Sequence, residues 1–156
     1  MVDRTKIEYA RWLALYYLSH RMLTVAMLKE KLINKGVPEA VANEALAYVA
    51  ECGYLDDFDY SVRFIRDAHE IKRHGKMRIV RALREKGVDN ATVEAAMNSC
   101  EINFSDNIPE LIAKKAKGVD MRDYKARQKV VAFLVRRGFS YDEIKRGIEQ
   151  FLEVAE

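Results

Sequence analysis

Two adjacent carboxylates, Asp56 and Asp57, and three histidines, His20, His69 and His74, are the residues whose types could support acid–base or metal chemistry. Neighbouring residues of a helix point about 100° apart, so the two carboxylates would not converge on one substrate or ion. They stand where a helix must begin, and we interpret them as helix caps. His69 and His74 lack the cysteine or carboxylate neighbours at helical spacing that zinc sites usually have. The sequence therefore predicts no catalytic residue, no metal site and no enzyme activity.

Basic side chains cluster in two stretches of a chain whose formal net charge is only +3. Residues 61–87 carry nine basic side chains against three acidic ones, and residues 114–138 carry nine against two. Such clusters create local fields that the net charge hides, and they are the electrostatic footprint of a protein that binds polyanions. The alternatives are a solvated helix face and, for the last two cations, a helix C-terminus whose dipole they complement. The candidate binding residues are Arg63, Arg66, Lys72, Arg73, Lys76, Arg78, Arg81 and Arg84 in the first stretch, and Arg122, Lys125, Arg127, Lys129, Arg136 and Arg137 in the second.

Aromatic side chains can stack on the bases of single strands when they are exposed. Most of those in this chain fall on apolar stripes, so we expect them in the core. This expectation covers Trp12 and Tyr16, which are four residues apart on the first helix. It also covers Tyr60, Phe64, Phe133, Phe139 and Phe151. Tyr124, which lies between two cations of the second basic stretch, is the aromatic residue that we expect to meet a partner.

The elements that must position these residues recur along the chain. A leucine, two residues, a cation and a glycine appear three times, and the glycines Gly36, Gly87 and Gly138 are 51 residues apart. Apolar residues repeat in the same register on both sides, so we interpret the chain as an internal repeat. We predict an all-α fold of three tandem three-helix repeat units, at residues 1–54, 55–103 and 104–156, that form an elongated, curved helical array.

Each repeat is expected to contain three helices. A cation followed by glycine is a helix stop, because glycine accepts the left-handed conformation and the cation suits the helix dipole. Pro38, Asp89 and Ser140, two residues beyond the glycines, suit the start of the third helices, and Ser140 with Glu143 has the spacing of a capping box. We predict first helices near 5–19, 57–73 and 106–117, and second helices near 24–35, 76–86 and 121–137.

The predicted helices of the middle repeat separate apolar from basic residues. In the second helix, Ile79 and Leu83 should face the core, whereas three of the candidate arginines should project elsewhere. In the first helix, Arg63, Arg66 and Arg73 should share one face.

The bulk composition is that of an intracellular globular protein. Apolar residues make up 49% and charged residues 33% of the 156 residues. Cys52 and Cys100 are far apart without a metal or redox spacing, so one disulfide is open but nothing indicates a secreted scaffold. The sequence shows no signal peptide and no apolar run long enough to span a bilayer. We therefore expect a cytoplasmic protein that does not contact membranes.

Four motifs in order resemble the RecX family of bacterial recombination regulators over nearly the whole chain. They begin with Tyr17-Leu18-Ser19-x-Arg21-x-x-Thr24, continue through Gly53-Tyr54-Leu55-Asp56-Asp57 and Gly75-x-x-Arg78-Ile79, and close on Phe133-Leu134-x-Arg136-Arg137-Gly138-Phe139. The chain departs from the family pattern at Ala26 and Met27, where an acidic residue is usual. We therefore expect the start of that helix to be less firmly fixed.

The resemblance implies a regulator that binds the RecA nucleoprotein filament and inhibits its recombinase, ATPase and co-protease activities in DNA repair and the SOS response. It also implies no cofactor and no catalysis. We expect a monomer whose basic residues contact RecA or the phosphates of single- or double-stranded DNA. The alternative is a non-specific nucleic-acid-binding helical protein without a RecA partner.

Overall fold

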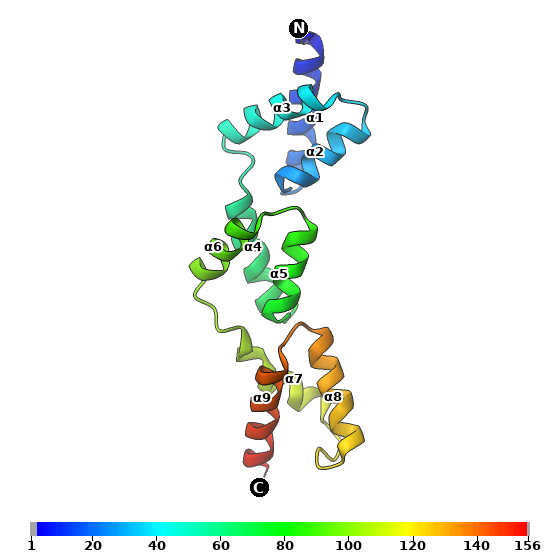
Figure 1. Ribbon diagram of the computed structural model, residues 1–156, viewed down its shortest axis with the longest axis vertical. Coiled ribbons are helices and arrows are strands. Elements are labelled where there is room, and N and C mark those ends of the chain that lie inside the picture. The colour runs from blue at the N-terminus through cyan, green and yellow to red at the C-terminus, as the bar shows by residue number, and fades with distance from the viewer. Residues whose placement is uncertain (1–2, 156) are drawn as a thin grey trace. The chain divides into compact units, whose positions relative to one another are not determined.

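The computed structural model describes residues 3–155, and all of the regular structure in this range is helical (Figure 1). The chain order is α1 (Arg4–His20), α2 (Val25–Asn34), α3 (Glu39–Glu51), α4 (Asp57–Glu70), α5 (Lys76–Glu85), α6 (Asn90–Ser99), the 3₁₀ turn η1 (Phe104–Asn107), α7 (Ile108–Lys115), α8 (Tyr124–Arg136) and α9 (Tyr141–Val154). This order confirms the prediction of an all-α fold.

The helices pack into two compact units. Unit 1 comprises Met1–Phe64 and Leu83–Ser99, and unit 2 comprises Ile65–Ala82 and Cys100–Glu156. The boundary between the units therefore passes through α4 and α5. The two boundaries between the predicted repeats, after residues 54 and 103, stay a prediction.

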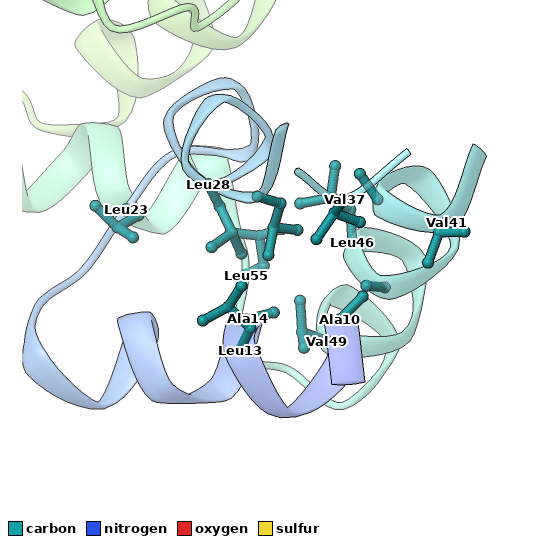
Figure 2. Packing of buried hydrophobic residues seen from close by; sticks show 13 residues of the cluster. Ala10, Leu13, Ala14, Leu23, Leu28, Val37, Val41, Leu46, Val49 and Leu55 are labelled. Atoms are coloured by element: carbon teal, nitrogen blue, oxygen red, sulfur yellow. The ribbon is translucent and has the colours of Figure 1, made fainter. Parts of the chain in front are cut away.

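The core of unit 1 forms where α1 packs against α2 and α3. Small residues on α1, Ala10 and Ala14, are fully buried, which lets the backbone of α3 approach closely. Figure 2 shows this packing, with Ala10 beside Val49 of α3 and with Leu55 between Ala14 of α1 and Leu28 of α2. The buried residues of α1 thus mark the side of that helix that the rest of unit 1 covers.

The repeated glycines end α2, α5 and α8 in the same way. Gly36, Gly87 and Gly138 have φ angles of 85°, 83° and 99°, the left-handed conformation that glycine adopts without strain. The residue after each glycine donates its N–H to the carbonyl of the leucine five residues before it, for example Val88 to Leu83 at 3.1 Å. This is the bonding of a Schellman cap, so the predicted helix stops are confirmed.

Polar side chains fix the helix starts. One carboxylate oxygen of Asp56 accepts hydrogen bonds from the N–H groups of Phe58 (3.0 Å) and Asp59 (3.1 Å), which confirms its role as a cap. The predicted capping box of Ser140 and Glu143 is also present, with both of its reciprocal hydrogen bonds.

The start of α2 is held by side chains on both sides of it. The hydroxyl of Thr24 accepts from the N–H of Met27 at 3.1 Å. Asp57, which belongs to α4, accepts from the N–H of Val25 at 2.9 Å. The expectation of a loosely fixed start is therefore wrong, because a carboxylate from another helix supplies the acceptor that the local sequence lacks.

Unit 2 has its own core between α7, α8 and α9. Its fully buried residues include Ile112 of α7, Leu134 of α8 and Ile144 of α9. Phe139 is buried in the same cluster, while Phe133 and Phe151 pack partly buried against it, as the sequence predicts.

Several helix bounds differ by two or three residues from the predicted ones. Helix α4 ends at Glu70 instead of residue 73, because Arg73 adopts a left-handed φ of 56°. Arg73 therefore does not share a helix face with Arg63 and Arg66. Helix α7 begins at Ile108 after a 3₁₀ turn, with Pro109 in its first turn, and α8 begins at Tyr124 with Asp123 as its cap residue.

Candidate anion-binding site

The candidate basic residues are divided unevenly between the two units. All of them except Arg63 and Arg84 belong to unit 2. Those two are engaged within unit 1: Arg63 forms an ion pair with Asp59 at 3.3 Å, and Arg84 donates to the side chain of Asn90 at 2.8 Å. Unit 2 is therefore where the cations can form a shared surface.

The loop before α5 and the end of α8 meet backbone to backbone within unit 2. The N–H of Gly75 donates to the carbonyl of Arg137 at 2.7 Å, and the N–H of Met77 donates to the carbonyl of Gly138 at 3.1 Å. A Cβ atom on Gly75 would overlap the backbone of Gly138, and one on Gly138 would overlap Arg78. We call this contact, formed by residues 72–78 and 136–138, the unit 2 junction.

Two guanidinium groups complete the junction by donating across it. Arg137 donates to the carbonyl of Lys72 at 2.6 Å, and Arg78 donates to the carbonyl of Arg136 at 3.2 Å. The guanidinium of Arg137 also lies 5.2 Å from the centre of the Phe133 ring, within the range of a cation–π interaction. These contacts hold both charges in place before any partner arrives.

His74 lies partly buried in the junction, near three of its cations. Burial, together with the charges of Arg78, Arg137 and Lys72, lowers the pKa of His74 from 6.5 to about 4. The imidazole is therefore neutral at physiological pH, since a further cation is disfavoured there.

A groove along α8 carries the second set of cations. Its volume is about 680 Å³, and Val119, Ala126 and Val130 contribute its apolar lining. Asp123 is the acidic residue among the described residues that line it. The cations that line the groove are Lys115, Lys125, Lys129 and Arg136.

Arg136 belongs to both features, because its side chain lines the groove while its carbonyl accepts from Arg78. We define the candidate anion-binding site as this groove together with the unit 2 junction. Four cations around an apolar floor could hold phosphates or carboxylates by charge, while the floor packs against the less polar part of the partner.

Lys115 is a site residue that the sequence analysis did not select. It lies on α7, and its ammonium group is 4.7 Å from the centre of the Phe133 ring. The position of Lys115 beside the groove depends on how α7 packs against α8, which no local sequence signal specifies.

Other selected residues lie apart from the groove. Arg127 lines the opposite side of α8, beside Tyr141 and Ile148. Arg73 forms an ion pair with Glu110. Arg66, Lys76, Arg81 and Arg122 are exposed, and Tyr124 is 67% exposed.

The prediction that Trp12 and Tyr16 lie in the core is wrong. Trp12 is 59% exposed and Tyr16 is 48% exposed, because α2 and α3 cover the face of α1 that carries Ala10, Leu13 and Ala14. Tyr60 and Phe64, by contrast, are partly buried.

Among residues 3–155, no three side chains of the metal-binding types come close enough together to hold an ion. Cys52 and Cys100 are both free thiols. No helix in this range has the length and apolar character needed to cross a membrane.

The described residues define an all-helical protein of consecutive three-helix domains that carries a cationic surface. Models of the first, second and third three-helix domains of RecX match residues 10–48, 56–97 and 106–148. The chain therefore belongs to the RecX family, whose curated members carry the name regulatory protein rather than that of an enzyme.

Individual relatives support this assignment. The regulatory protein RecX of Vibrio parahaemolyticus is 35% identical over 131 residues, which cover 84% of each chain. That of Bacillus licheniformis is 29% identical, and the match spans 53% of its length. The crystal structure of RecX from Lactobacillus salivarius has the same fold, with a TM-score of 0.79 over 97% of this chain and 99% of that one at 23% identity.

Proposed function

We propose that this chain binds the RecA nucleoprotein filament and inhibits its recombinase, ATPase and co-protease activities in DNA repair and the SOS response. Membership of the RecX family supports a regulatory role. The structural observation that carries the proposal is the candidate anion-binding site of unit 2, to which α5, α7 and α8 contribute cations.

The geometry of this site suits a nucleoprotein partner. Such a filament offers phosphates and carboxylates, and both are recognised by lysine and arginine side chains. Because Arg78 and Arg137 are already held by carbonyl groups, less conformational entropy is lost when a partner binds near them. Phosphate contacts carry no base information, so the DNA contribution should have little sequence preference.

A titration of the chain into RecA assembled on single-stranded DNA, followed by ATP hydrolysis, tests the proposal. We expect inhibition at well below one molecule of this chain per RecA subunit. Full RecA activity at equimolar chain would contradict it. If the chain still bound DNA under those conditions, it would be a nucleic-acid-binding protein without a RecA partner.

A further inference from the structure

A row of aromatic rings lies exposed along α1, beside the face that carries its buried residues. Tyr9, Trp12 and Tyr16 are 50%, 59% and 48% exposed. The Tyr9 and Trp12 rings are 6.2 Å apart between centroids and 28° from parallel, and the Trp12 and Tyr16 rings are 5.7 Å apart and 20° from parallel. His20 continues the row at 4.7 Å from Tyr16. We call these four residues the aromatic ridge.

The core of unit 1 does not need the ridge. Ala10, Leu13 and Ala14 supply the packing of α1 against its neighbours. Apolar residues that are exposed singly are normal on a protein surface. Large aromatic rings that gather into one contiguous patch usually mark a binding surface.

A small cationic cavity adjoins one end of the ridge. It has a volume of about 150 Å³, and Lys6 and Tyr9 of α1 line it together with Lys35. The remaining lining comes from the turn of Gly36, Val37 and Pro38, so none of the described residues around the cavity is acidic. Two ammonium groups beside an aromatic ring are the arrangement that would take a phosphate next to a stacked base.

We infer that the aromatic ridge and this cavity bind single-stranded nucleic acid, with unpaired bases stacked on the rings and a backbone phosphate between Lys6 and Lys35. The exposed parts of the three rings offer π-surface on which unpaired bases can stack, and the lysines provide the charge that the backbone requires. A second copy of this chain fits less well, since its ridge of Tyr, Trp and His side chains would supply no negative charge to the two lysines. This inference goes beyond the proposed function, because it assigns base contacts to unit 1 and does not depend on the cationic site of unit 2.

Trp12 is the only tryptophan of the chain, so its fluorescence reports on the ridge directly. We expect oligothymidylate to quench this fluorescence with saturation, and an abasic oligonucleotide of the same length to quench it far less. Equal quenching by both would mean that phosphates alone are recognised and would overturn the inference. So would unchanged fluorescence when anisotropy of a labelled oligothymidylate shows that it is bound.

Variants that keep Trp12 locate the contact. Because stacking on one ring contributes about 1–3 kcal/mol, Tyr16→Ala should weaken oligothymidylate binding by roughly 5- to 150-fold, and Tyr16→Phe should restore most of it. Tyr54→Ala is the matched control, since Tyr54 is an exposed tyrosine of unit 1 outside the ridge. Equal losses in Tyr16→Ala and Tyr54→Ala would overturn the inference.

Inhibition of RecA is measured on the same variants, so that failure of this inference and failure of the proposed function stay distinguishable. If Tyr16→Ala lost RecA inhibition while oligothymidylate binding and Trp12 quenching were unchanged, the ridge would be a protein-docking surface and the nucleic-acid assignment would be wrong. If oligothymidylate binding fell while RecA inhibition persisted, the ridge would be confirmed as a separate nucleic-acid site.

Discussion

Each compact unit contains one junction of the same kind, between the segment before one helix and the end of another. Corresponding positions of the two junctions are 51 residues apart in the sequence, and the charged side chains around them are opposite in sign. In unit 1 the segment before α2 lies against the end of α5, and the hydroxyl of Thr24 donates to the carbonyl of Lys86 at 2.6 Å. In unit 2 the segment before α5 lies against the end of α8, and guanidinium groups donate to the carbonyls there. The position of Thr24 corresponds to Gly75 in the repeat.

The charges around the two junctions explain which unit carries the anion-binding site. Near the unit 1 junction, Asp57 accepts from Val25, and its pKa is raised by burial and by the charges of Asp89 and Asp56. At the unit 2 junction, burial and the charges of Arg78, Arg137 and Lys72 lower the pKa of His74 to about 4. A neutral hydroxyl closes the first junction, whereas charged guanidinium groups close the second. The second junction therefore carries a positive charge that the first does not.

The largest expected effect comes from crowding the unit 2 junction. Gly138→Ala forces a side chain into a left-handed position and into the backbone of Arg78, so we expect it to destabilise the protein by about 3–5 kcal/mol. Gly36→Ala is the matched control: its φ is also positive, but a Cβ there meets nothing within 4 Å, so about 1–2 kcal/mol of strain should remain. Urea denaturation measures both, and equal losses would contradict the packing of the junction.

The unit 1 junction should be sensitive to loss of a single hydroxyl. Thr24→Val removes the cap of Met27 and leaves the carbonyl of Lys86 without its donor, at a cost of about 1–3 kcal/mol. Thr24→Ser keeps both hydrogen bonds and should lose less. Thermal denaturation of the two variants compares them, and a Thr24→Val protein as stable as Thr24→Ser would show that the hydroxyl is not needed.

Removal of the groove cations should change the salt dependence of DNA binding. If Lys125, Lys129 and Arg136 each contact one phosphate, each contact adds about 0.7 to the slope of log affinity against log salt concentration on single strands. Replacement of all three by Ala should therefore reduce this slope by about 2. Replacement of Arg21, Lys29 and Lys31 by Ala in unit 1 makes the same change in charge and should alter the slope far less. Equal changes in both triple variants would show that diffuse charge drives the binding.

The smallest effect is the pH dependence that His74 of unit 2 contributes to stability. Because the folded-state pKa of His74, about 4, lies below its ordinary value of 6.5, the unfolded chain binds the proton more readily. The folded state should therefore lose stability as the pH falls from 6.5 towards 4, and His74→Gln should remove part of this dependence. Titration of the imidazole by NMR measures the pKa, and a midpoint near 6.5 would contradict the cationic surroundings.

Local signals predicted much of the fold but little of the site. The cation–glycine phrases predicted the ends of α2, α5 and α8, and the spacing of Ser140 and Glu143 predicted a capping box that is present. These features depend on a few neighbouring residues, so a sequence pattern contains them.

The features that sequence reasoning missed depend on packing between elements. Helix α1 has apolar residues on two sides, and only its contact with α3 decides that Ala10 is buried while Trp12 is exposed. Likewise, nothing near Arg78 in the sequence indicates that it donates to the carbonyl of Arg136, which lies 58 residues away.

The most direct test of the central claim is ATP hydrolysis by RecA on single-stranded DNA in the presence of the groove variant. The chain in which Lys125, Lys129 and Arg136 are replaced by Ala should inhibit RecA at least about 10-fold less effectively than the unaltered chain, a change of roughly 1.4 kcal/mol. The triple variant of Arg21, Lys29 and Lys31 should inhibit almost normally. Undiminished inhibition by the groove variant, with its fold intact by circular dichroism, would contradict the assignment of the binding site to unit 2.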